Sequence, residues 1–257
     1  MTISPKIQCT IEDQVATITL NRAEKLNALD LEMLSALEET ARAIEQDRSV
    51  RVVVLTGAGD KAFCAGADIK AWSALRPLQM WSDWVRQGHR TFDQLARLRQ
   101  PLICALNGIA FGGGLELALT ADLRLASAHA QFAFPEVTIG TVPGWGGTRR
   151  LPALVGPARA KEMILTGKRV DTETASQWGL VNEVVPAQGL MNRASELANQ
   201  IAKNASVAVQ LAKQIIDANE AGAGAAFESL AGALAATTEE GREGVAAFLE
   251  KRPPRFS

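Results

Sequence analysis

The order of strand-like and helix-like segments along the chain constrains the fold more than any other feature. Up to about residue 185, short apolar runs typical of strands alternate with stretches of helical periodicity. From residue 189 onward the sequence is alanine-rich and helical, with a break at GAGAA (222–226). Parallel strands need crossover connections, usually helices, so this alternation predicts an α/β fold with mainly parallel pairing. We expect a core over residues 1–195 and a helical C-terminal region over residues 196–257.

Two of the apolar runs are continuous and end at a glycine. They are VRVVVLTG (50–57) and PLICALNG (101–108). A strand that is buried on both faces has such an uninterrupted run, so both segments are predicted to be central strands. Two short β-branched runs, 7–11 and 15–20, predict a hairpin, and further strands are predicted at 122–127 and 180–185. Helices are predicted at 26–47 (starting near Asp30), 76–98, 113–121, 147–167 (broken near Gly156) and 172–179.

Residues 111–119, FGGGLELAL, place three glycines before a glutamate that lies between leucines. The N-terminus of a helix carries unpaired N–H groups, and glycines let a ligand atom reach them. With Gly113 near the helix start, Glu116 lies one turn further on the same face. The segment therefore predicts an N–H donor and a carboxylate that face one cleft. The alternative is a first-turn glutamate that faces solvent.

A second glutamate, Glu136, follows Pro135 in the segment FAFPEV (132–137). Burial among such apolar neighbours would raise its pKa and make it a useful proton donor. The alternative is an acid that caps a short helix. The glycine-rich segment VPGWGGT (142–148) follows, and its Trp145 either shapes an apolar pocket or belongs to the core.

Two other motifs are weaker. GAGDKA (57–62) matches a dinucleotide-binding pattern, but neither the expected helix nor a second strand ending in an acid about 20 residues on is present, so a turn is predicted. Cys64 would need a base to act as a nucleophile, and His89 and His129 lie in uninformative contexts. A buried core cysteine is the better interpretation. The small residues 65–67 beside it would let a ligand approach the main chain.

Composition excludes several classes of function. The net charge of −1 lacks the basic surplus of a nucleic-acid binder. There is no run of about 18 apolar residues and no signal-like N-terminus, so no membrane association is expected. Three widely separated cysteines favour a reducing, cytoplasmic compartment. No cluster has metal-ligand spacing, and the absence of tyrosine excludes mechanisms that need a phenol.

Two carboxylates beside small-residue loops suit acid–base chemistry next to a carbonyl that becomes an enolate. A glycosidase also uses two carboxylates, but an aromatic content of 5% is poor for stacking on sugars.

Six ordered segments resemble the enoyl-CoA hydratase/isomerase (crotonase) superfamily: 20–30, 62–70, 101–127, 132–151, 165–185 and 246–256. The resemblance implies a spiral of ββα units with a C-terminal helical trimerisation region, and trimers that often pair into hexamers. It further implies an acyl-CoA thioester substrate, no metal or redox cofactor, and a role in fatty acid β-oxidation.

The resemblance assigns the backbone amides of Ala67 and Gly113 to an oxyanion hole. It assigns Glu116 to orienting and activating water, and Glu136 to exchanging a proton with C2. The implied reaction is syn addition of water to a trans-2-enoyl-CoA, which gives a 3-hydroxyacyl-CoA. The remaining implied contacts with substrate or CoA are Lys25, Leu26, Ala28, Ala65, Asp68, Ile69, Lys70, Gly112, Pro135, Gly144, Trp145, Phe248 and Lys251, the last two sometimes across a subunit boundary.

Two alternatives remain open. One is an isomerase, or a dehydratase of a substituted acyl-CoA, that retains both acids. The other is a noncatalytic binding protein, for instance for RNA, which would have lost an acid and gained a basic surface. Phe134 and Trp145 depart from residues common in hydratases, and both are expected to enlarge the apolar wall near the acyl group and to alter acyl preference.

Overall fold

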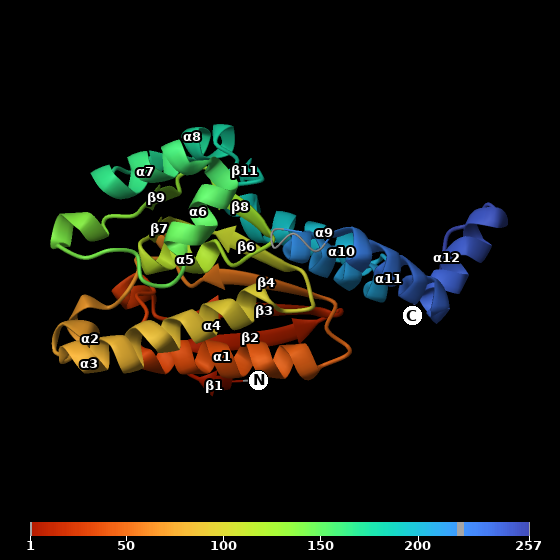
Figure 1. Ribbon diagram of the computed structural model, residues 1–257, viewed down its shortest axis with the longest axis horizontal. Helices are drawn as coiled ribbons and strands as arrows, with labels where there is room; N and C mark the ends of the chain where they lie inside the picture. The colour runs from red at the N-terminus through yellow and green to blue at the C-terminus, as the bar shows by residue number, and fades with distance from the viewer. Residues whose placement is uncertain (1, 220–223, 257) are drawn as a thin grey trace.

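The computed structural model describes residues 2–219 and 224–256, in which the strands form a large and a small sheet (Figure 1). In spatial order the large sheet is β1 (Thr2–Ser4), β2 (Ile7–Glu12), β3 (Val15–Leu20), β4 (Val52–Gly57), β6 (Leu102–Leu106), β8 (Leu123–Ser127) and β11 (Glu183–Val185). The small sheet is β10 (Val170–Asp171), β9 (Gln131–Ala133), β7 (Ile109–Phe111) and β5 (Ala62–Cys64).

A ββα unit repeats along the chain. In β4–β5, β6–β7 and β8–β9, the first strand joins the large sheet and the second joins the small one, and helices follow each pair. Strands β3, β4, β6, β8 and β11 pair in parallel, as do β5, β7 and β9. Each unit therefore advances both sheets by one strand, and the chain forms a spiral. The predicted α/β spiral of ββα units is confirmed.

The helical elements follow the predicted segments closely. They are α1 (Leu31–Gln46), α2 (Ile69–Ser73), α3 (Pro77–Gln79), η2 (Met80–Val85), α4 (Arg86–Ala96), α5 (Gly113–Ala118), α6 (Gly147–Val155), α7 (Pro157–Thr166), α8 (Thr172–Gln177), α9 (Leu190–Ala202), α10 (Ser206–Asn219), α11 (Gly224–Thr237) and α12 (Glu239–Leu249), with short turns η1 (Ala23–Lys25), η3 (Glu136–Ile139) and η4 (Ala187–Gly189). Helix α1 begins after Asp30, as expected, because the Asp30 carboxylate accepts a hydrogen bond from the amide of Met33.

The two continuous apolar runs that end at a glycine, 50–57 and 101–108, form the buried strands β4 and β6. Every residue of β4 and β6 is buried, since α9 covers one face of these strands and the small sheet and further helices cover the other. One core fills the space between the sheets and helices α1, α4 and α5, and a second lies under α9. The segment after Gly57 is a turn that leads into β5, so the dinucleotide pattern has no helix behind it.

The helix predicted at 76–98 is interrupted. Residues 80–85 form a π-helical stretch, η2, between α3 and α4. Such stretches occur frequently at functional sites. The periodicity also gave no indication of strands β5, β7 and β9, which have only three residues each and are too short for a period of two to be visible.

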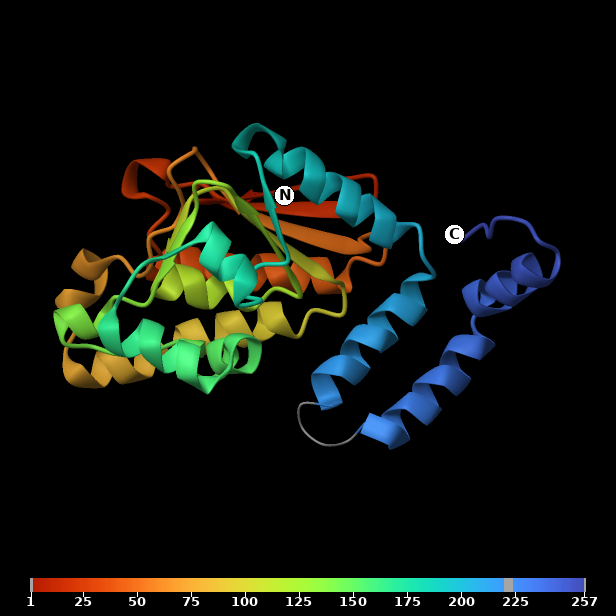
Figure 2. The same ribbon diagram turned by 90° about the horizontal axis from the view of Figure 1, so that it is seen from above.

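Helices α10 to α12 project from the body beyond α9 (Figures 1 and 2). Two ion pairs hold this region: Lys213 in α10 bonds Asp122 at 2.5 Å, and Arg51 bonds Glu240 in α12 at 3.3 Å. The predicted boundary between 195 and 196 falls inside α9, and the division into two regions stays a prediction. The predicted break at 222–226 lies partly outside the described residues. No helix in the described ranges is long and apolar enough to cross a membrane.

Candidate active site

A cavity of about 150 Å³ opens where the small sheet meets the starts of α2 and α5. Most of the segments singled out in the sequence contribute to it. Its lining consists of Ala65, Gly66, Ala67, Ile69, Trp72, Met80, Trp84, Val85, Gly112, Gly113, Glu116, Pro135, Glu136, Ile139, Thr141, Val142, Gly144 and Trp145.

The amides of Ala67 and Gly113 lie on adjacent segments of this cavity. A Cβ added to Gly113 would lie 3.5 Å from the nitrogen of Ala67, and one added to Gly66 would lie 3.5 Å from the nitrogen of Gly113. In the residues described, neither amide donates to a protein acceptor. The bridge at Ala67 is made by the amides of Leu29 and Asp68, and Gly113 lies in the first turn of α5. The two N–H groups are therefore available to one small acceptor.

The glycines of this site are required by space as well as by backbone conformation. Gly112 has φ +49°, and a Cβ there would lie 2.8 Å from Oε1 of Glu136. Gly66 has φ +106°, and its Cβ would lie 2.8 Å from the carbonyl oxygen of Phe111. A Cβ on Gly114 would lie 2.1 Å from the carbonyl of Cys64. Gly66 and Gly114 thus let two stretches of main chain pack directly against each other, and Gly112 leaves room for the carboxyl of Glu136.

Glu116 is buried, with 2% of its surface exposed, which excludes a solvent-facing first-turn glutamate. Its Oε1 accepts hydrogen bonds from the amides of Trp145 and Gly147, both at 2.7 Å. Burial raises the pKa of Glu116, while the backbone donors and the positive charge of Arg150 act in the opposite direction. The carboxylate is therefore held in one orientation at the cavity wall.

Glu136 begins η3, on a different wall of the same cavity. Its Oε2 is buried and has no hydrogen-bond partner in the described part of the chain. Burial, with a smaller contribution from the negative charge of Glu116, raises the pKa of Glu136 to about 7. This carboxyl is thus close to half-protonated at neutral pH, whereas Glu116 has donors that stabilise its charge.

An aromatic cluster forms the inner wall. The ring of Trp145 lies 5.3 Å from that of Trp84 and 5.2 Å from that of Phe92. A Cβ on Gly88 would lie 2.1 Å from Nε1 of Trp145, so the glycine provides the space for the indole. This places Trp145 in the wall, as expected. The expectation for Phe134 is wrong: its fully buried ring packs behind Glu116, against Gly147, because β9 directs it into the core.

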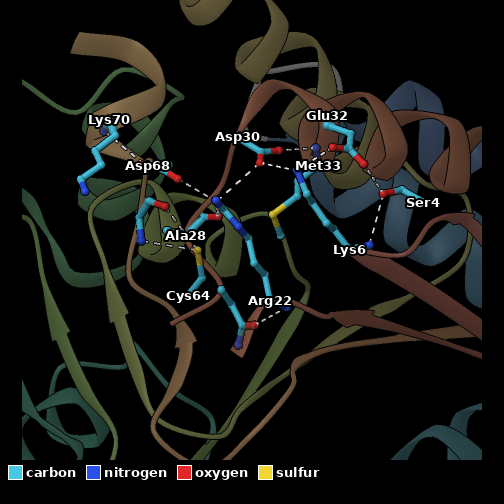
Figure 3. Close-up of polar contacts among 12 residues, drawn as sticks. Ser4, Lys6, Arg22, Ala28, Asp30, Glu32, Met33, Cys64, Asp68 and Lys70 are labelled. Carbon is cyan, nitrogen blue, oxygen red and sulfur yellow. Dashed lines mark hydrogen bonds and ion pairs between the residues drawn. The ribbon is translucent and has the colours of Figure 1, made fainter. Parts of the chain in front are cut away.

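A charged network fixes the outer side of the Ala67 segment (Figure 3). Arg22 donates to the carbonyl of Ala28 at 2.9 Å and pairs with Asp68 at 2.8 Å and Asp30 at 3.5 Å. Asp68 caps α2 and Asp30 caps α1, so one guanidinium joins the starts of both helices. The sequence reasoning did not single out Arg22, although it lies in the first of the segments that carry the family resemblance.

The predicted substrate contacts divide into three groups. Ala65, Ile69, Gly112, Pro135, Gly144 and Trp145 line the cavity. Lys25, Leu26, Ala28, Asp68 and Lys70 lie outside its lining but on adjoining chain, since the amide of Ala65 bonds the carbonyl of Leu26 at 2.9 Å. Phe248 and Lys251 lie at α12, far from the cavity within this chain (Figure 1). Their predicted contact with CoA therefore needs a neighbouring subunit.

Besides Ile139, Thr141 and Val142, four lining residues from the segment 72–85 were not predicted: Trp72, Met80, Trp84 and Val85. The last three belong to η2, which the sequence presents as ordinary amphipathic helix. Cys64 behaves as the core residue that was expected, because complete burial raises the pKa of its thiol to about 12.

A spiral of ββα units with this cavity between its turns defines a crotonase-type protein. A sequence profile described as enoyl-CoA hydratase/isomerase matches residues 10–257. The chain belongs to the enoyl-CoA hydratase/isomerase family.

Individual relatives agree with this membership. The chain is 42% identical to the short-chain-enoyl-CoA hydratase of Clostridium acetobutylicum over 94% of its length and 93% of the relative. It is 39% identical to the carnitinyl-CoA dehydratase of Proteus mirabilis over 99% of both chains. The crystal structure of an enoyl-CoA hydratase from Bacillus anthracis superposes with a TM-score of 0.94, at 40% identity and with 98% of both chains covered.

Proposed function

We propose that the protein is an enoyl-CoA hydratase, which adds water syn across the C2=C3 bond of a trans-2-enoyl-CoA to give a 3-hydroxyacyl-CoA. One observation carries this proposal: two unpartnered main-chain amides and two carboxyls in unlike environments surround one apolar cavity. Donors held in place for a developing oxyanion are usually the largest single contribution to catalysis of this kind.

In the proposed reaction the thioester oxygen accepts hydrogen bonds from the amides of Ala67 and Gly113. Ionised Glu116 takes a proton from water as the water oxygen bonds to C3, and electron density moves to the thioester oxygen. Protonated Glu136 then delivers its proton to C2, which restores the carbonyl. The pair of carboxyls holds one proton before and after the reaction. Because the charge of Glu116 also raises the pKa of Glu136, the two acids titrate as a coupled pair.

The same acids serve the reverse reaction. Glu136 must then be ionised to accept the C2 proton, and Glu116 must be protonated to release water. Both directions thus need a pair that holds one proton, and the pKa of about 7 for Glu136 suits such a pair at neutral pH.

We also propose a homotrimer, or a hexamer of paired trimers, built through the C-terminal helices. Large apolar side chains are exposed there: Ile216 is 67% exposed, Val245 63%, Phe248 82% and Leu249 74%. Burial against a second copy would remove this surface from water, and it would bring Phe248 and Lys251 to a neighbouring site. Sedimentation analysis tests the assembly, and a monomer at micromolar concentration would refute it.

Further proposals follow the resemblance: CoA contacts along 25–28 and 65–70, no metal or redox cofactor, a role in fatty acid β-oxidation and a cytoplasmic location. The three buried cysteines are in keeping with a reducing compartment.

The test is loss of enoyl-thioester absorbance when crotonyl-CoA is added. Glu116→Gln and Glu136→Gln should each lower kcat by orders of magnitude while the thermal unfolding transition is retained. Glu39→Gln, at an exposed position of α1, is the control and should match the wild type. Absence of turnover by the wild type, or near-normal turnover by either site variant, would contradict the proposal.

The alternative is dehydration of a substituted 3-hydroxyacyl-CoA, which the 39% identical carnitinyl-CoA dehydratase brings into consideration. The aromatic faces of Trp84 and Trp145 suit an unsubstituted apolar acyl group, but such faces also attract cationic groups, so the wall is compatible with both substrates. Parallel assays with crotonyl-CoA and a cationic 4-substituted analogue decide between them.

A further inference from the structure

Arg150 lies at the back of the loop that binds Glu116. It belongs to α6, and its side chain is only 9% exposed. One nitrogen, Nη1, donates to the carbonyl of Trp145 at 3.0 Å. The other, Nη2, pairs with Asp93 of α4 at 2.6 Å. A single guanidinium therefore joins α4 to the 144–147 loop.

The carbonyl that Arg150 holds lies between the two donors that Glu116 uses. Along the chain the order is the amide of Trp145, the carbonyl of Trp145 and the amide of Gly147. Gly146 between them has φ +104°, and a Cβ there would lie 2.4 Å from Nη1 of Arg150. Gly146 thus provides both the left-handed turn of the loop and the space for the guanidinium.

We propose that Arg150, anchored by Asp93, is a positioning residue that keeps the amides of Trp145 and Gly147 on the carboxylate of Glu116. The inference rests on the proposed function, because it assigns Arg150 a part in orienting the base of that reaction. Arg150 does not line the cavity, so it acts through the loop and not on the substrate.

The positive charge of Arg150 and its hydrogen bond to the loop both favour the ionised form of Glu116. The charged groups that act on Glu116 are Glu136 across the cavity and Arg150 on α6. Arg150 is the positive one of these, and its charge opposes the rise in pKa that burial imposes on Glu116. Loss of Arg150 removes this charge and frees the loop, so both effects raise the pKa of Glu116.

A bond that merely fastens α6 to α4 would affect stability and leave the pH dependence of the reaction unchanged. The titration of Glu116 therefore separates a positioning role from a structural one.

The experiment compares Arg150→Met with Arg149→Met. Arg149 is a matched control, because it precedes Arg150 in the same helix, its side chain is 68% exposed, and its ion pair within the described part of the chain is the long one with Asp93, at 3.5 Å. For Arg150→Met we expect kcat to fall about tenfold to a hundredfold with little change in KM, since a buried charge-assisted hydrogen bond is lost. The acidic limb of kcat/KM should move to higher pH by about one unit. Arg149→Met should stay within about twofold of the wild type.

A second readout needs no turnover. In protein labelled with ¹³C at the glutamate carboxyls, the Glu116 signal is identified by its loss in Glu116→Gln, and its titration is followed in each variant. Should wild-type protein fail to hydrate crotonyl-CoA, the proposed function falls, and this titration still decides the role of Arg150.

An upward shift of the Glu116 pKa in Arg150→Met, absent in Arg149→Met, supports the inference. An unchanged Glu116 titration, or equal shifts in the two variants, overturns it. If Arg150→Met does not fold, Arg150→Lys replaces it, because a lysine keeps the positive charge but cannot bond the carbonyl of Trp145 and the carboxylate of Asp93 together as the guanidinium does. A smaller shift in the same direction is then the expected result, and no shift overturns the inference.

Discussion

The substitution Gly113→Ala tests the proposed oxyanion hole by adding a single methyl group. The new Cβ would lie 2.6 Å from Cζ3 and 2.8 Å from Cε3 of Trp145, and 3.5 Å from the nitrogen of Ala67. An acceptor bound by the two amides must approach to about 2.7–3.1 Å, so the methyl would compete with it for the same space. Trp145 is 2% exposed and packed against Trp84 and Phe92, so its ring has little room to move away.

The size of the effect follows from these contacts. Overpacking against the indole should cost about 1–3 kcal/mol of folding free energy. Loss of one oxyanion donor should raise the barrier by about 3–4 kcal/mol, which lowers kcat by about 10²–10³-fold. Hydration of crotonyl-CoA and thermal unfolding measure the two effects separately.

Gly144→Ala is the control, because Gly144 lines the same cavity and an added Cβ there meets nothing within 4 Å. The double variant Gly113→Ala/Trp145→Leu removes the clash with the indole but keeps the methyl beside Ala67. We expect it to recover stability without recovering kcat. Near-normal turnover by Gly113→Ala, or full recovery of kcat by the double variant, would refute the assignment of these amides.

Four further outcomes are expected. Hydration needs Glu136 protonated, so kcat/KM should fall as pH rises through about 7, and a flat profile between pH 6 and 9 would contradict the assignment. The folded pKa of Glu136 is raised, so its contribution to stability is present at low pH and lost as pH rises through about 7; Glu136→Gln should therefore raise the Tm at pH 8 and change it little at pH 5. Trp145→Ala should enlarge the cavity and shift acyl preference toward longer or branched chains, at a cost of about 3–5 kcal/mol in stability, and an unchanged rate profile over a chain-length series would refute the role of Trp145. The Cys64 thiol, with a pKa of about 12 in a fully buried position, should resist iodoacetamide at pH 8, so alkylation of the native protein with loss of activity would revive a nucleophilic role.

A structural feature could be predicted from the sequence where its physical cause lies within one short segment. The continuous runs of β4 and β6 predict burial on both faces, and Asp30 predicts the start of α1. The glycines before Glu116 predict a helix N-terminus open to a ligand, and the glutamate itself is buried there.

Other features depend on segments far apart in the chain. Strands β5, β7 and β9 have three residues each and exist only because each pairs with the next. The side chain of Phe134 turns away from the cavity that its neighbour Glu136 faces, and no local pattern decides between these directions.

The α/β class, the positions of the main helices and strands, and the two glutamates with their glycine-rich neighbours could be predicted from the sequence, because periodicity, capping and burial act within a few residues. The packing of distant segments placed the amides of Ala67 and Gly113 side by side and closed one wall of the cavity with η2 and Trp145. It alone also placed Arg150 behind the loop that holds Glu116. These arrangements arise when successive turns of the spiral stack, and the distances between such turns are a property of the packed molecule and not of any one segment.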